Sequence, residues 1–335
     1  MSLLAITALA LVSASLGCAL FIPLAPRLRL MDAPVQRSAH RVVTPSSGGV
    51  VIILALLFAL AAAWLTGIVR PPANAVTLLA GLGGVCVLGA WDDRRALPVR
   101  VRLPLFFLIA ALVVSQFTST GGSAADTPGG ALWLLPLLVL AFAWLLNLYN
   151  FMDGIDGLAA LQCVWVAACL GVMGLRADAP GAFVLLSAVT AGSYGGFLLL
   201  NWPPARLFMG DAGSLSAGYL LGLLGLWGWR DGFLPVAAWV LLMSPFLLDA
   251  TFTLLLRAWR GERLTEAHST HVYQRLARNW ASGHRGVAVA LLVLQLLWLT
   301  PLSVAALFEL APQWTLMALG LFPQLFLIAK SQRFT

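Results

Sequence analysis

The stretch Gly49-Val-Val-Ile-Ile-Leu-Ala-Leu-Leu-Phe-Ala-Leu-Ala-Ala-Ala-Trp-Leu-Thr-Gly-Ile68 decides the fold class of this chain, because it contains no charged side chain. A helix of about 20 apolar residues spans a hydrocarbon layer of ~30 Å, since each helical residue adds about 1.5 Å. The stretch therefore predicts a helix that crosses a membrane.

Similar apolar runs recur along all 335 residues, of which 61% are hydrophobic and 10% are charged. A water-soluble globule does not bury so much apolar surface, so lipid must solvate it. We predict an all-α, polytopic transmembrane helical bundle that forms one integral membrane domain, residues 1–335. About eleven spans are expected, at Leu3–Leu24, Gly49–Ile68, Ala75–Ala90, Leu103–Phe117, Ala131–Leu148, Leu158–Leu175, Gly181–Leu200, Leu215–Trp229, Phe233–Leu256, Val287–Phe308 and Trp314–Ala329.

The basic residues predict the orientation of these spans. With the amino terminus outside, 17 of the 20 Lys and Arg residues fall inside, and only Arg70, Arg176 and Arg230 fall outside. The positive-inside rule then gives an N-out, C-in topology. The net charge of +7 is spread over loops between spans rather than over one basic domain, so no nucleic-acid partner is expected. The expected cytoplasmic loops are about 25–48, 91–102, 147–157, 201–214 and 257–286.

The acidic residues gather on the same side. Eight of the thirteen map to the cytoplasmic ends of spans, namely Asp32, Asp92, Asp93, Asp153, Asp156, Asp211, Glu262 and Glu266. This crowding predicts a site on the inner face. Asp249 lies inside the ninth span, where an ionisable group is costly and indicates either a function or a polar partner on a neighbouring helix.

The segment from Asn147 to Leu158 carries an oxygen-bearing side chain at every third position: Asn147, Asn150, Asp153 and Asp156. On a regular helix each such step falls ~60° short of a full turn, so the first and last side chains would point to opposite faces. We therefore expect the segment to unwind at its glycines and to gather amide and carboxylate oxygens around a hard cation.

Two further acidic motifs each allow two interpretations. The adjacent Asp92 and Asp93 suit a metal ion, a base, or salt bridges to the arginines that follow them, but they also suit a charged helix stop. The segment from Asn201 to Ser214 suits a helix that begins with Asp211 as its N-cap, and the glycines there also suit bound phosphate.

Two basic segments suit phosphate anions. One contains His268 and His271 between Glu262 and Arg278, and its alternative is a solvated helix at the membrane interface. The other contains Arg37 and His40 before Gly48, and its alternative is a plain membrane edge.

Taken together and in this order, these segments resemble the polyprenyl-phosphate N-acetylhexosamine-1-phosphate transferases, of the glycosyltransferase family 4 type. The resemblance covers nearly the whole chain. Its most specific parts are Asp92-Asp93, Asn150-Phe-Met-Asp153-Gly-Ile-Asp156-Gly-Leu and Phe208-Met-Gly-Asp211-Ala-Gly-Ser214.

The resemblance implies the following chemistry. A sugar-1-phosphate would pass from a UDP-N-acetylhexosamine to undecaprenyl phosphate in a bacterial inner membrane, with release of UMP and a cytoplasmic active site. Asn150 and Asp211 would hold Mg²⁺, with Mn²⁺ as a substitute, and Asp92 or Asp93 would handle the lipid phosphate. Asp153, Asp156 and Asn201 would line the uridine-diphosphate site.

The roles implied for the remaining residues are less specific. Asn147, His271, His40 and Arg37 are candidate substrate-binding residues. His268 resembles the family's loop histidine and, with Asp92, Asp93 and Asp211, is a candidate catalytic residue. A homodimer is compatible with the resemblance.

One segment departs from the branch that acts on the MurNAc-pentapeptide. That branch carries three successive histidines followed by Phe-Glu, where this chain has His268-Ser-Thr-His271-Val-Tyr-Gln. The departure favours the branch that acts on simple UDP-amino sugars. The rival class, an ion-coupled secondary transporter, predicts acids near the midplane and on both sides of the membrane.

Overall fold

The computed structural model describes residues 2–33, 42–118, 131–263 and 269–331, and it confirms a polytopic helical bundle. Within these residues, ten helical segments are long and apolar enough to cross a membrane. The elements are α1 Leu3–Phe21, β1 Met31–Asp32, β2 Thr44–Pro45, α2 Gly48–Leu65, α3 Ala75–Arg94, α4 Val99–Thr118, α5 Ala131–Phe151, α6 Leu158–Arg176, α7 Gly181–Asn201, α8 Gly210–Arg230, α9 Val236–Trp259, α10 Val272–Asn279, α11 Gly283–Leu294, the π-helical turn η1 Gln295–Leu299, α12 Thr300–Leu307 and α13 Gln313–Ser331. Residues Gly283–Leu307, from α11 through α12, form one span.

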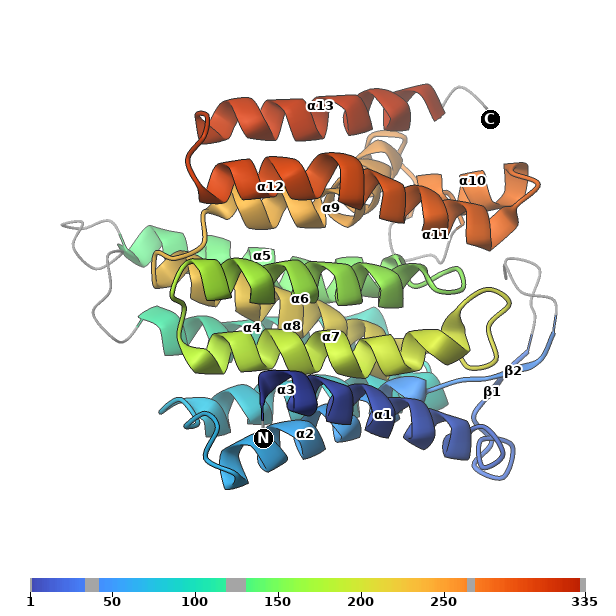
Figure 1. Ribbon diagram of the computed structural model, residues 1–335. Helices are drawn as coiled ribbons and strands as arrows, with labels where there is room; N and C mark the ends of the chain where they lie inside the picture. The colour runs from blue at the N-terminus through green and yellow to red at the C-terminus, as the bar shows by residue number, and fades with distance from the viewer. Residues whose placement is uncertain (1, 34–41, 119–130, 264–268, 332–335) are drawn as a thin grey trace.

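The long helices run side by side (Figure 1). The last helix, α13, ends on the side of the bundle that carries β1, β2 and α10, while α1 begins on the opposite side. We call the side with β1, β2 and α10 the site end of the bundle. Termini on opposite sides fit an odd number of crossings, as the sequence predicts.

The predicted span that is absent from these ten, Leu215–Trp229, lies in α8. This helix of 21 residues is as long as its neighbours, but glycines and serines make it less apolar. It packs against α2, α3 and α5, and most of its residues are buried. Because protein rather than lipid covers α8, the helix can cross the bundle without an apolar surface.

Several predicted boundaries differ from the structure by three to five residues, and three of these differences, at the site end, bear on the site. The helix α3 continues through Arg94 instead of ending at Ala90, α5 continues to Phe151, and α8 begins at Gly210 instead of Leu215. Hydropathy marks where side chains are apolar, whereas a helix continues as long as its polar side chains find partners or water. The predicted loop residues Asp92, Asn147, Asn150 and Asp211 therefore lie on helix ends.

The predicted unwinding after α5 is confirmed. Residues 152–157 separate α5 from α6, and Gly157 has a φ of 76°, which favours glycine.

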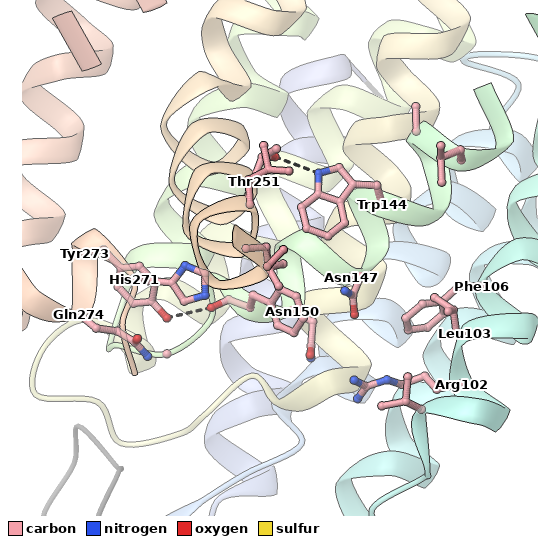
Figure 2. A pocket seen from close by; sticks show the side chains of 18 of the residues that line it. Arg102, Leu103, Phe106, Trp144, Asn147, Asn150, Thr251, His271, Tyr273 and Gln274 are labelled. Carbon is pink, nitrogen blue, oxygen red and sulfur yellow. Dashed lines mark hydrogen bonds between the residues drawn. The ribbon is translucent and has the colours of Figure 1, made fainter. Parts of the chain in front are cut away.

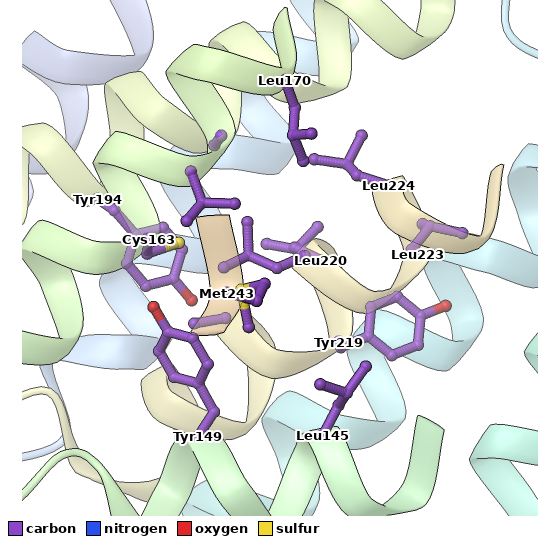
Figure 3. Packing of buried hydrophobic residues seen from close by; sticks show 14 of the residues in the cluster. Leu145, Tyr149, Cys163, Leu170, Tyr194, Tyr219, Leu220, Leu223, Leu224 and Met243 are labelled. Atoms are coloured by element: carbon purple, nitrogen blue, oxygen red, sulfur yellow. The ribbon is translucent and has the colours of Figure 1, made fainter. Parts of the chain in front are cut away.

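Small residues let the helices approach closely where lipid gives no hydrophobic driving force. On α7, a side chain at Gly192 or Gly196 would collide with the backbone of α1. The centre of the bundle is apolar: Tyr149, Tyr194 and Tyr219 surround Cys163, Met243 and several leucines (Figure 3). The hydroxyl of each of these tyrosines donates a hydrogen bond to a backbone carbonyl, so all three buried hydroxyls have a partner.

Candidate active site

Three segments far apart in the sequence meet where α8 begins. The backbone N–H groups of Gly48 and Gly49, at the start of α2, donate to the carbonyls of Phe208 and Met209 at 3.0 and 2.8 Å. A side chain at Gly49 would collide with the backbone of Gly213. The start of α2 is therefore fixed against the start of α8.

The carboxylate of Asp93 ties α3 to the same place. Its Oδ1 accepts the backbone N–H of Asp211 at 2.7 Å, and its Oδ2 accepts the hydroxyl of Ser47 at 2.8 Å. A carboxylate at a helix N-terminus satisfies an orphan N–H group and suits the positive end of the helix dipole. The interpretation of Asp211 as the N-cap is wrong, because Met209 holds that position and Asp93 supplies the capping oxygen.

The side chain of Asp211 instead faces α5. Its Oδ1 accepts the side-chain amide of Asn150 at 2.7 Å, and that amide also lies 3.1 Å from the hydroxyl of Ser214. The structure thus brings together the two residues that, by the family resemblance, would be metal ligands. About 31% of the Asp211 side chain is exposed, so it is open to a bound group.

Asp92 pairs with a residue that the sequence analysis did not place in the site. Its Oδ2 accepts Nη1 of Arg102 on α4 at 2.7 Å, and its Oδ1 accepts the N–H of Leu97 at 2.6 Å. The same Nη1 lies 3.9 Å from Oδ2 of Asp211. The salt bridge of Asp92 is therefore made to Arg102 rather than to the arginines that follow it directly.

The turn after α5 brings two more carboxylates to this end of the bundle. Burial, and then repulsion from Asp211, Asp93 and Asp156, raises the pKa of Asp153 well above its ordinary value. Asp156 accepts the N–H of Ala205 at 3.1 Å and lies 3.3 Å from Nδ1 of His284. The surroundings of Asp153 therefore disfavour its charged form.

Asn201 links the turn to the segment before α8. Its side chain accepts the N–H of Gly157 at 2.9 Å and donates to the carbonyl of Leu207 at 2.9 Å, and it is buried. Both ends of the amide are occupied by backbone groups. The contact holds the two segments together, and a role in substrate binding stays a prediction.

The donor set fits a hard divalent cation. Asp92, Asp93, Asp153 and Asp211 crowd one end of the bundle, and in the described part of the chain Arg102 is the arginine that pairs with them. A cation would relieve the remaining repulsion. Within the described ranges, no three His, Cys, Asp or Glu side chains form a ready-made cage. Mg²⁺ needs no such cage, because it is bound through one or two carboxylates, water and substrate phosphates.

A cavity of about 860 Å³ opens beside these residues (Figure 2). Its walls come from α4, α5 and α9 and are mostly apolar, and the wall residues Leu137, Leu140 and Leu255 are more than half exposed on the surface of the bundle. Its polar lining includes Arg102, Asn147, Asn150, His271 and Gln274. Figure 2 shows Asn147 and Asn150 between His271 on one side and Arg102 on the other.

Of the three histidines predicted for the site, only His271 lies within the described residues. His271 is buried at the start of α10 and lines the cavity, 3.3 Å from Asp249. His268, His40 and Arg37 lie outside the described residues, so their roles stay predictions. His284 beside Asp156 was not expected, because no local motif marks it.

The arrangement can perform one kind of chemistry well. Oxygen ligands suited to a cation lie next to a cavity that has apolar walls and an arginine at its polar end. Such a site can hold a phosphate group at the membrane boundary while an attached chain stays in contact with lipid.

The comparisons with known proteins agree with this geometry. Residues 75–228, from α3 to α8, match the model of glycosyl transferase family 4. The chain is 31% identical over 282 residues to a probable undecaprenyl-phosphate N-acetylglucosaminyl 1-phosphate transferase of Bacillus subtilis, covering 81% of this chain and 76% of that protein.

Two other relatives are similar in part. A decaprenyl-phosphate N-acetylglucosaminephosphotransferase of Mycobacterium leprae is 28% identical over 304 residues, covering 81% of this chain and 75% of that protein. A phospho-N-acetylmuramoyl-pentapeptide-transferase of Moorella thermoacetica is 31% identical over 220 residues, covering 60% of this chain and 66% of that protein.

Fold, site and relatives define a multi-pass membrane enzyme that transfers a phosphosugar. The chain belongs to the polyprenyl-phosphate N-acetylhexosamine-1-phosphate transferases of glycosyl transferase family 4. The wider coverage by the N-acetylglucosaminyl relative agrees with the departure from the pentapeptide branch at residues 268–274. Membership of this family favours an enzyme over the ion-coupled transporter.

We predict that Asp93→Ala destabilises the protein, while Asp93→Asn does not. Alanine removes the acceptors for Asp211 N–H and Ser47, which costs about 1–3 kcal/mol. Asparagine keeps an oxygen for the N–H, and its amide can donate to the serine hydroxyl. Thermal unfolding in detergent, followed by tryptophan fluorescence, checks this. Equal midpoints for the two variants would contradict the capping role of Asp93.

Proposed function

We propose that this protein transfers N-acetylhexosamine-1-phosphate from a UDP-sugar to undecaprenyl phosphate, releasing UMP and starting the synthesis of a lipid-linked glycan, such as O-antigen or another envelope polysaccharide. One observation supports this most strongly: the Asn150–Asp211 pair lies at the polar end of a cavity with apolar walls. A lipid phosphate and a nucleotide-sugar diphosphate need to meet at such a boundary.

The cavity suits the acceptor. Its walls are open to the lipid-facing surface at Leu137, Leu140 and Leu255, so a polyprenyl chain can enter from the bilayer. The phosphate of the acceptor would then lie near Arg102 and Asn147 at the polar end. An arginine binds phosphate oxygens through charge-assisted hydrogen bonds.

The residues of the cluster suit Mg²⁺, with Mn²⁺ as a substitute. Asp211 would hold the ion through its exposed carboxylate, and Asn150 would hold it through its amide oxygen. When bound, the ion neutralises the charge on the diphosphate oxygens.

The reaction exchanges one phosphoanhydride bond for another. A phosphate oxygen of the acceptor attacks the β-phosphorus of the UDP-sugar, the bond from that phosphorus to the bridging oxygen breaks, and UMP leaves with the electron pair. At neutral pH a phosphate monoester is mostly dianionic, since its second pKa is about 6. The acceptor therefore needs orientation more than deprotonation.

The geometry gives Asp92 and Asp93 roles that suit this need. Asp92 holds the guanidinium of Arg102, and Asp93 holds the first turn of α8 that carries Asp211. Asp92 would thereby place Arg102 against the acceptor phosphate, and Asp93 would place Asp211, with its cation, against the donor diphosphate. Asp153, Asp156, Asn201 and His271 are proposed to lie around the donor.

The protein is proposed to act in a bacterial inner membrane with the site end facing the cytoplasm. The arginine asymmetry supports this orientation, because the basic loops lie at the site end. UDP-sugars would then reach the site from the cytoplasm.

We predict that Asp211→Asn lowers turnover by about 100-fold or more, because a principal ligand for the cation loses its charge. The purified protein is incubated with undecaprenyl phosphate, Mg²⁺ and a panel of UDP-sugars, and UMP and lipid-linked sugar are measured. Asp231→Asn, at the far end of α8, is the matched control and keeps normal activity.

Removal of Mg²⁺ with a chelator should stop the wild-type reaction, and Mn²⁺ should restore it. Normal turnover in a folded Asp211→Asn variant would contradict the assignment of Asp211 as a ligand of the cation. If the wild type forms neither UMP nor lipid-linked sugar with any of the UDP-sugars, the proposed reaction is wrong.

We also predict that Ala141→Trp weakens binding of the acceptor. Ala141 lines the cavity, so an indole there would fill space that the polyprenyl chain needs. The KM for undecaprenyl phosphate should rise by about 10-fold, while the KM for the UDP-sugar stays near its wild-type value. Ala111→Trp, on the exposed face of α4, is the control. An unchanged acceptor KM would place the chain elsewhere.

A further inference from the structure

Asp249 is a buried carboxylate within α9 that the proposed reaction does not use. Only 5% of the residue is exposed, and it does not line the cavity. An ionisable group inside a membrane span is costly unless its surroundings compensate it. Its partners therefore indicate what it does.

Those partners come mainly from one short segment. Oδ1 of Asp249 accepts the N–H of Val272 at 3.0 Å and lies 3.3 Å from Nδ1 of His271. Oδ2 accepts the N–H of Tyr273 at 3.0 Å. Thr253, one turn further along α9, donates its hydroxyl to Oδ1 at 3.1 Å.

These contacts cap a helix from outside. Val272 and Tyr273 are the first residues of α10, whose N–H groups have no acceptor within their own helix. The N-cap residue His271 makes no side-chain capping hydrogen bond to α10. A carboxylate in this place satisfies two N–H groups and interacts favourably with the helix dipole.

The capped helix in turn touches the site. His271, Tyr273 and Gln274 line the cavity. The hydroxyl of Tyr273 donates at 2.9 Å to the carbonyl of Phe151, which is the last residue of α5 and follows Asn150 directly. A side chain at Gly154 would collide with this hydroxyl, so the turn after α5 is shaped around it.

We infer that Asp249 is a positioning residue, which caps α10 and, through Tyr273, fixes the end of α5 that presents Asn150. The route runs from the Asp249 carboxylate to the N–H of Tyr273, and from the Tyr273 hydroxyl to the Phe151 carbonyl. The inference rests on the proposed function, and it assigns Asp249 neither ion transport nor contact with substrate. His271 is held by the same carboxylate, so its ring also keeps a fixed place in the cavity.

The first test combines hydrogen–deuterium exchange with kinetics on the full-length protein. In Asp249→Ala, amide exchange in residues 269–280 should rise while peptides from α3 and α8 stay as protected as in the wild type. The kcat should fall by about 10- to 100-fold, as expected when a reacting group is displaced by about 1 Å, with the donor KM within about twofold. Asp249→Asn keeps one acceptor oxygen and should restore part of both properties.

Thr253→Val is the matched control. It removes a hydrogen bond to the same oxygen but leaves the two bonds from Asp249 to the N–H groups of α10, and Thr253 does not line the cavity. Exchange in 269–280 and kcat should therefore stay near the wild type. Unchanged exchange in 269–280 of Asp249→Ala would overturn the capping role. Loss of protection throughout the protein would show a purely structural role and would also overturn the inference.

The second variant, Tyr273→Phe, keeps the ring and the backbone N–H but breaks the link to Phe151. We expect kcat to fall while α10 keeps its protection, and the double variant with Asp249→Asn should lose less than the two single losses multiplied, because both act along one route. A wild-type kcat in Tyr273→Phe would overturn this route. Absence of product in the wild type would disprove the proposed reaction. Hydrogen–deuterium exchange does not depend on turnover, so it would still show whether Asp249 caps α10.

Discussion

Repulsion among carboxylates at one end of a lipid-solvated bundle is the constraint on which this structure depends. Asp92, Asp93 and Asp211 lie on helix ends that pack together, and Asp153 follows in the adjoining turn. The bundle compensates some of this charge internally, through Arg102 and through the N-terminus of α8. The negative charge that remains uncompensated at Asp211 favours a bound cation. The apolar cavity beside it is open to a lipid chain.

Much of the fold could be predicted from the sequence, because lipid imposes simple rules on helix length and polarity. The span at Gly49–Ile68 and the unwound turn at Gly157 follow from hydropathy and from glycine chemistry alone. Helix ends were less predictable: α3 runs on through Asp92 and Asp93 because α4 and α8 provide partners for these charges. Such partners belong to the tertiary structure, which a hydropathy pattern does not contain.

The candidate site was predictable in its composition but not in its contacts. The family resemblance implies that Asn150 and Asp211 share a cation, and the structure places their side chains 2.7 Å apart. That they bind a metal stays a prediction. Arg102 was counted only for orientation, since nothing local links it to Asp92, ten residues earlier. The capping of α8 by Asp93 and the contact of His284 with Asp156 join segments more than 100 residues apart, so no local spacing indicates them.

The most direct test of this account is the binding of Mn²⁺ to the purified protein, measured by electron paramagnetic resonance without substrates. Mn²⁺ is suited to this measurement because it prefers oxygen ligands as Mg²⁺ does. The account predicts a bound Mn²⁺ in the wild type and in the control Asp231→Asn, and its loss in Asp211→Asn. Equal Mn²⁺ binding by wild type and a folded Asp211→Asn variant would contradict the claim that this cluster is a cation site.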